Sequence, residues 1–154
     1  MKSWRAISAG CCSVLAGVLA LTGCEPPVPD AGAAESTLTS RGAWTRTADS
    51  GGTAAVYFVL GNSADVADTL RGVSSDAALT TGMHMSMQHS GMMQMAPVRT
   101  LPVPADDSVN FRPLGAHVML EGLRHSLREG DTVRVRLDFV SGRSIEVRAD
   151  VRRP

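Results

Sequence analysis

Apolar and polar residues alternate along much of the 154-residue chain, and this alternation predicts strands rather than helices. The clearest example is residues 131–140, DTVRVRLDFV, in which valine, leucine and phenylalanine recur at every second position from Val133 to Phe139. Successive side chains of a strand point to opposite faces, so this segment is predicted to be a strand with one buried face. The segment SGRSIEVRADV follows across a Ser141-Gly142 turn, and the two segments are expected to pair as a hairpin.

A second strong strand is predicted over residues 53–61, TAAVYFVLG. Further strands are expected at residues 43–46, 68–75, 79–86, 92–98, 108–113 and 117–123. Residues 125–131 are expected to form a turn, and no long helix is predicted. Short strands broken by glycine, proline, asparagine and aspartate are typical of a sandwich or barrel. We therefore expect one all-β domain with a modest core over residues 43–154.

The N-terminal region has a different composition. Two basic residues, Lys2 and Arg5, precede an apolar run that ends in LTGC at Cys24. This layout is typical of a secretory signal peptide, and LTGC resembles the lipobox of bacterial lipoproteins, in which the cysteine carries the lipid. We interpret residues 1–23 as a lipoprotein signal peptide; a membrane-spanning helix is the alternative, because the run has about the 18 residues that such a helix requires. Residues 24–42 are rich in proline and small residues and are expected to be a lipidated, flexible linker.

This interpretation places the domain outside the cytoplasm, on the periplasmic or extracytoplasmic side, and restricts its chemistry. Removal of residues 1–23 would leave 13 basic residues, all arginine, against 15 acidic ones, and Cys24 as the only cysteine. A nearly neutral chain offers no basic surface for nucleic acid. Thiolate nucleophiles or ligands, disulfides and Schiff-base lysines would all be missing from the domain.

Methionine and histidine are concentrated in one segment. Residues 82–95, GMHMSMQHSGMMQM, hold six of the eight methionines and two of the four histidines. The period of two places His117 and Met119 on one face of a strand, and Met93 and Met95 on one face of another. Imidazole and thioether groups form a soft donor set that suits Cu(I), whereas Zn(II), Mg(II) and Ca(II) prefer thiolate, imidazole or oxygen. Core packing by methionine is the alternative explanation.

The spacing of these residues resembles that of a known family. His84, Met95, His117 and Met119 reproduce the pattern H(M)x10Mx21HxM of the periplasmic copper chaperones called PCu(A)C, and Met85 fills the optional position. The resemblance extends through AWTR, AAVYFVLGN, GMMQMAPV and GAHVMLEGLRHSLREGDTV, and so covers nearly all of residues 42–151.

The resemblance implies a cupredoxin-like Greek-key β-sandwich that is not an enzyme. It implies Cu(I) bound by two histidines and two methionines, His84, Met95, His117 and Met119. It also implies delivery of copper to the dinuclear copper centre of cytochrome c oxidase, with an oxidase subunit or another periplasmic copper chaperone as the partner. Additional side chains of the same segment could form an auxiliary metal site or could be packing residues: Met83, Met85, Met87, His89, Met92 and Met93.

Three other functions remain open at this stage. An electron-transfer cupredoxin requires a cysteine thiolate in its copper site, and Cys24 is remote from the predicted sandwich. A hydrolase could use Ser90 beside His89, or the triplet His125, Ser126 and Asp131, but no GxSxG motif is present. A metal-free structural or binding lipoprotein would use its methionines only for packing.

Overall fold

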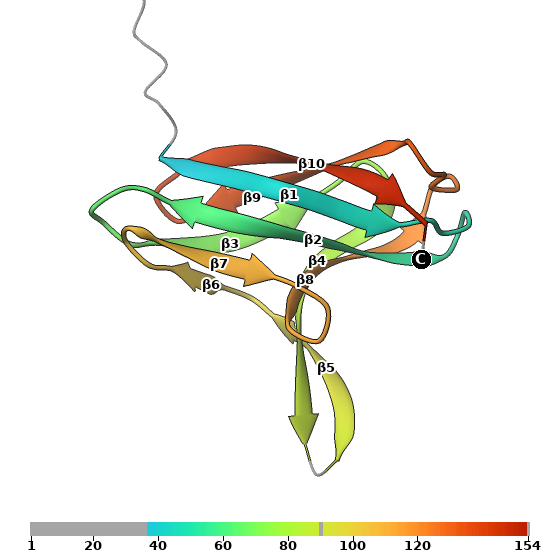
Figure 1. Ribbon diagram of the computed structural model, residues 1–154, viewed down its shortest axis with the longest axis horizontal. Helices are drawn as coiled ribbons and strands as arrows, with labels where there is room; N and C mark the ends of the chain where they lie inside the picture. Colours follow the sequence, from blue (N-terminus) through green and yellow to red (C-terminus); the bar gives the residue numbers. More distant parts are fainter. Residues whose placement is uncertain (1–36, 90, 154) are drawn as a thin grey trace, which may run out of the picture. The chain divides into compact units, whose positions relative to one another are not determined.

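A computed structural model describes residues 37–89 and 91–153, except the side chain of His89. The described residues form ten strands and no helix, which confirms the all-β prediction (Figure 1). The strands are β1 (Leu38–Arg46), β2 (Thr53–Asn62), β3 (Asp68–Ser74), β4 (Ala78–His89), β5 (Met92–Val98), β6 (Leu101–Val103), β7 (Asp107–Phe111), β8 (Ala116–Leu123), β9 (Thr132–Phe139) and β10 (Ser144–Arg152). No element in these two ranges is a helix long and apolar enough to cross a membrane. The predicted signal peptide, and the linker as far as residue 36, lie outside the described residues.

The strands form one hydrogen-bonded network in the order β5-β4-β8-β7-β2-β1-β10-β9-β3-β6, with β8 also paired to β2. β1 pairs with two strands. Leu38 near its start pairs with Asn62 of the antiparallel strand β2. Trp44 near its end pairs with Asp150 of the parallel strand β10 as well as with β2. The register on β2 shifts between Arg41 and Trp44, beside Gly42, whose φ of 62° is readily adopted only by glycine. This irregularity lets a single strand connect the β2–β8 layer to the β9–β10 layer.

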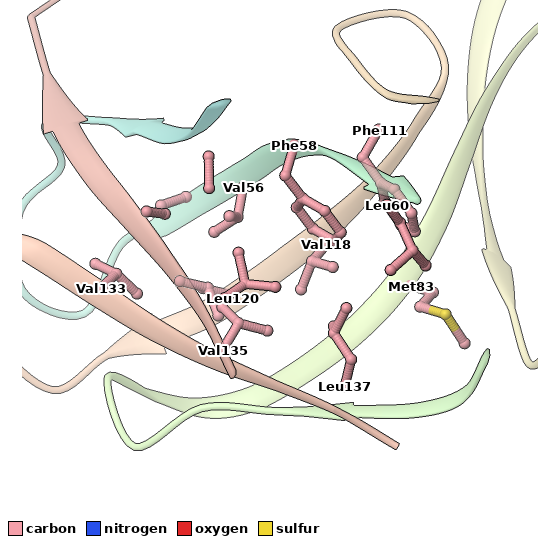
Figure 2. Packing of buried hydrophobic residues seen from close by; sticks show 14 of the residues in the cluster. Val56, Phe58, Leu60, Met83, Phe111, Val118, Leu120, Val133, Val135 and Leu137 are labelled. Atoms are coloured by element: carbon pink, nitrogen blue, oxygen red, sulfur yellow. The ribbon is translucent and has the colours of Figure 1, made fainter. Parts of the chain in front are cut away.

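The core lies between these two layers. The residues of alternating phase predicted to face inward are buried, as Val56, Phe58, Val118, Val135 and Leu137 illustrate (Figure 2). The rings of Phe58 of β2 and Phe111 of β7 stack with their centroids 4.2 Å apart. β9 is thus apolar on the face that points to the core and polar on the other, as the sequence pattern predicted.

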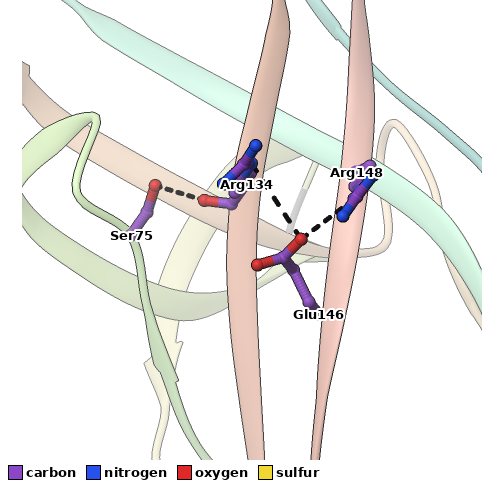
Figure 3. A network of polar contacts seen from close by, with 4 residues as sticks. All are labelled: Ser75, Arg134, Glu146 and Arg148. Carbon is purple, nitrogen blue, oxygen red and sulfur yellow. Dashed lines mark hydrogen bonds and ion pairs between the residues drawn. The ribbon is translucent and has the colours of Figure 1, made fainter.

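The outer face of β9 and β10 is polar and charged (Figure 3). Glu146 of β10 accepts a hydrogen bond from Nε of Arg148 at 2.9 Å and lies 4.0 Å from Nε of Arg134. Ser75 donates to the backbone carbonyl of Arg134 at 2.6 Å. Because these side chains are exposed, each ion pair contributes at most about 1 kcal/mol.

The largest differences from the prediction are two strand boundaries and one missed strand. β1 begins at Leu38 instead of residue 43, so the last five residues of the expected linker belong to the sheet. Leu38 is 2% exposed, and a single apolar residue in LTSRG is too little to reveal a strand by alternation. β4 continues to His89, three residues beyond the expected end. β6 was missed because a strand of three residues, Leu101–Val103, has no measurable period.

The hairpin of β4 and β5 extends away from the other strands (Figure 1). β4 pairs with β8 as far as Met85 opposite Ala116. Beyond Met85 its one remaining partner among the described strands is β5, as far as His89 opposite Met92. Met83 anchors the base of the hairpin in the core and is 6% exposed (Figure 2). The outer half of the hairpin is therefore a two-stranded ribbon.

Candidate metal centre

Strand register brings the four predicted ligands together at the base of this hairpin. His84 of β4 lies directly opposite His117 of β8, and Gly82 lies opposite Met119. On the other side of β4, Ser86 lies opposite Met95 of β5. Residues directly opposite in antiparallel strands point to the same face, and residues two apart on one strand share that face. His84, Met95, His117 and Met119 therefore lie on a single face of three adjacent strands.

The two histidine rings are neighbours, with centroids 5.9 Å apart and planes inclined at 49°. His117 is 3% exposed, and its Nδ1 lies 3.0 Å from the backbone carbonyl of Gly115. A carbonyl oxygen can only accept, so Nδ1 must carry the proton and Nε2 the lone pair. Such a bond at the far nitrogen is what fixes the orientation and tautomer of a metal-binding histidine.

A cavity of about 380 Å³ opens beside these residues. Its lining includes three of the predicted ligands, Met95, His117 and Met119, together with Tyr57 and Leu114. Met95 is 60% exposed, so the cavity is reached from solvent on the β5 side. Buried imidazole on one side and an exposed thioether on the other give the site a rigid inner part and an accessible outer part.

Gly82 leaves open space beside the His84 ring, and the sequence analysis did not single out this glycine. A Cβ at this position would stand 3.5 Å from Nε2 of His84 and 3.7 Å from its Cδ2. Because Gly82 has no side chain, Nε2 of His84 stays uncovered on the side of Gly82. Met119 is the cross-strand partner of Gly82, so this side faces Met119. The relevance of Gly82 depends on strand register, which alternation along one segment does not reveal.

Aromatic rings continue from the histidine pair along the face of β2 and β1 that points away from the core. Tyr57 of β2 lies 6.3 Å from His117 between ring centroids, and Trp44 of β1 lies 4.7 Å from Tyr57. The only sequence signal for Tyr57 was its position on the face of β2 opposite to Phe58 and Leu60. The Tyr57 ring lies beside the His117 ring and contributes to its burial, and Trp44 packs against Tyr57 in turn.

The extra methionines do not form one group. Met83 packs in the core, and Met85 is partly buried against it, which favours packing for both. Three others are exposed: Met87 (53%), Met92 (65%) and Met93 (50%). The expected auxiliary site of Met83, Met85, Met87, His89 and Met93 thus falls on two faces of the hairpin, and the His89 side chain lies outside the described part of the chain.

Two residues of the alternative hydrolase interpretation, Ser126 and Asp131, have structural roles, and Ser90 lies outside the described residues. The Ser126 hydroxyl accepts a hydrogen bond from the Ser50 amide at 3.1 Å. One carboxylate oxygen of Asp131 accepts from the Arg128 amide at 2.8 Å and closes the turn before β9. These polar groups are therefore engaged with the backbone of the loops that hold them.

The donor chemistry at the hairpin base fits a soft monovalent cation. Within residues 37–89 and 91–153, no group of three or more histidine, cysteine, aspartate or glutamate side chains is arranged to hold a metal. Two imidazoles and two thioethers, from His84, His117, Met95 and Met119, are the candidate donors at the hairpin base. Such a set adds no negative charge and matches Cu(I) better than a divalent ion.

This open β-sandwich is the fold of a PCuAC-type domain. Residues 38–151 match the family model described as "Putative lipoprotein LpqE-like", and the chain belongs to this family. It is 30% identical over 146 residues to "Putative lipoprotein Lxx21020" of Leifsonia xyli subsp. xyli, covering 91% of this chain and 87% of that protein.

Solved structures share the fold. The copper-bound PCuAC domain from PmoF2 is 24% identical, with a TM-score of 0.63 over 77% of this chain and 94% of that domain. The solution structure of CuI-DR1885 from Deinococcus radiodurans is 30% identical, with a TM-score of 0.54 over 79% of this chain and 83% of that protein. This likeness confirms the fold expected from the resemblance to PCu(A)C proteins.

Proposed function

We propose that this protein is an exported copper chaperone that binds one Cu(I) through His84, Met95, His117 and Met119. The observation that carries the proposal is the pairing of His84 of β4 with His117 of β8, because Met119 follows on β8 and Met95 lies on β5, the other neighbour of β4. The copper-bound state of the PmoF2 domain and the Cu(I) state of DR1885 support copper as the cargo. Delivery to a copper enzyme, with the dinuclear centre of cytochrome c oxidase as the acceptor, completes the proposed role.

Copper release would proceed by ligand exchange, without turnover of a substrate. His117 is buried and held by Gly115, so it would act as the fixed inner ligand. Met95 is exposed and has a flexible side chain, so it is the ligand that a donor of the acceptor protein would reach first. Copper would then pass through a state in which both proteins hold it, and no free ion would form. Because only neutral imidazole binds metal, copper affinity is expected to fall in acid.

The cell envelope is the proposed location. The family and the Leifsonia relative are both described as lipoproteins, which supports an exported protein attached to a membrane. We assign the attachment to a lipid on Cys24, which would leave the domain from Leu38 onward outside the cytoplasm. A copper acceptor in the same compartment would then be within reach.

A competition titration with a Cu(I) chelator tests the proposed site. The wild-type chain from residue 25 onward, which retains every described strand, is compared with His117→Ala and Met95→Ala at two pH values. His125→Ala is the matched control, because His125 is exposed and lies outside the hairpin base. We expect one tight Cu(I) equivalent that His117→Ala binds much more weakly and His125→Ala binds as tightly as the wild type. Equal binding by all four proteins would favour the metal-free lipoprotein, and a blue Cu(II) complex would favour electron transfer.

A further inference from the structure

The β4–β5 hairpin carries thioether groups beyond the proposed four ligands, and strand register divides them between its faces. Met93 lies opposite Gln88, two pairs further out than Met95 opposite Ser86. Met93 and Met95 therefore share the face of His84, whereas Met87 and Met92 point to the other face. Met93 is the methionine that extends the copper-binding face toward the hairpin tip.

Distance allows Met93 and Met95 to hold one ion together. Residues two apart on a strand are separated by about 6.6–6.8 Å at their Cα atoms, and each methionine side chain has three rotatable bonds. Met93 is 50% exposed and Met95 60% exposed, so both sulfurs can move without disturbing the core. Met95 also borders the cavity at the hairpin base. The same residue would therefore contribute both to the proposed four-ligand site and to an ion held together with Met93.

The hairpin surface is uncharged, in contrast to the outer face of β9 and β10. Residues 82–98 contain no aspartate, glutamate, lysine or arginine, although 19% of the whole chain is charged. β5 is an edge strand, and exposed edges usually carry charges that keep other proteins away. A neutral, methionine-bearing edge neither repels a cation nor attracts a hard divalent ion, and it is open to a partner that offers soft ligands.

From this placement we propose a second, outer Cu(I) position formed by Met93 and Met95, which copper occupies on its way between the inner site and an acceptor. The inference rests on the proposed function. In the outward step a bond from copper to the Met93 sulfur forms, the bonds to Met119, His84 and last His117 break, and the bond to Met95 is kept. Copper stays monovalent, and no electron or proton is exchanged. Thiolates of the acceptor then replace the two thioethers.

The test measures single-turnover transfer of Cu(I) from the loaded chain to a short peptide that carries two cysteine thiols. Met93→Leu is compared with Met87→Leu, a control of equal chemistry and similar exposure on the opposite face. We expect Met93→Leu to slow transfer about tenfold, because the rate-limiting step then proceeds without one weak copper–sulfur bond, while the equilibrium affinity is unchanged. Met87→Leu should transfer copper at the wild-type rate. The outer position is refuted if the two variants have the same rate.

A second readout does not depend on kinetics. In protein labelled on its methionine methyl groups, Ag(I) serves as a redox-stable probe for Cu(I) in an NMR titration. The first equivalent should shift Met95 and Met119, and the second should shift Met93 while Met87 stays unchanged. Shifts of Met87 and Met92 in place of Met93 would overturn the proposal. Failure of the proposed function itself is recognised separately, because His117→Ala would then keep the first equivalent.

Discussion

Replacement of Gly82 by alanine is expected to weaken Cu(I) binding and to stabilise the fold at the same time. Gly82 lies within β4, where glycine costs about 0.5–1 kcal/mol relative to alanine because the unfolded chain has more freedom to lose. The added Cβ would contact Nε2 of His84 at 3.5 Å, an ordinary van der Waals distance, so the sheet can accept it. The free energy of unfolding should therefore rise by up to ~1 kcal/mol.

Copper binding should respond in the opposite direction. A metal–imidazole bond is about 2.0–2.1 Å long, so a methyl group in contact with Nε2 crowds the position that the ion would take. Disturbance of the groups that support a metal ligand typically lowers affinity about 10–100-fold, and we expect a decrease of this size. A thermal melt of the metal-free chain and a Cu(I) competition titration measure the two effects.

Gly72→Ala in β3 is the matched control, since a Cβ there would find its nearest neighbour at 4.0 Å, the Cβ of Asp138. This variant should leave copper affinity unchanged. If Gly82→Ala were stabilised yet bound Cu(I) as tightly as the wild type, the space beside His84 would have no role in binding.

Three further predictions concern the fold. Leu38→Ala should lower the free energy of unfolding in urea by roughly 2–3 kcal/mol, because it removes a buried side chain from the start of β1; a change below ~0.5 kcal/mol would mean that this end of β1 is not part of the core. Leu114→Gly should raise stability by about 0.5–1 kcal/mol, because Leu114 has a φ of 60°, and unchanged or lower stability would contradict strain there. Burial raises the pKa of Asp68, but hydrogen bonds from Ser141 and Thr69 and the charge of Arg143 outweigh it, so the net pKa lies below its ordinary value. The resulting stabilisation is present above about pH 4 and is lost as pH falls through the lowered pKa, so Asp68→Asn should be less stable at pH 7 and less sensitive to acid; parallel pH–stability curves would refute this.

Strands with strict alternation could be predicted from the sequence, because burial of one face leaves a period of two. Residues 132–139 are the example, and the predicted inward residues Val133, Val135, Leu137 and Phe139 are all buried. The strand at residues 53–62 was instead predicted from a continuous run rich in β-branched and aromatic residues. The start of β1 could not be predicted, since Leu38 is its only buried residue before Ala43. Its place in the sheet depends on the pairing of Leu38 with Asn62 at the far end of β2, which alternation within one segment does not reveal.

The candidate site could likewise be predicted from the sequence only in part. Spacing along the chain identified His84, Met95, His117 and Met119 as a set, and register places them on one face. The space at Gly82 and the bond between His117 and Gly115 arise from tertiary contacts that spacing does not encode. The sequence likewise grouped Met83 with the exposed methionines, because burial at the hairpin base depends on how the hairpin packs on the core.

X-ray absorption spectroscopy of the chain loaded with one equivalent of Cu(I) tests the central claim most directly. The account predicts a first coordination shell of two nitrogen and two sulfur atoms, which loses one nitrogen in His117→Ala and one sulfur in Met119→Ala. A shell with only sulfur, or one that neither substitution changes, would contradict a centre shared by His84, Met95, His117 and Met119.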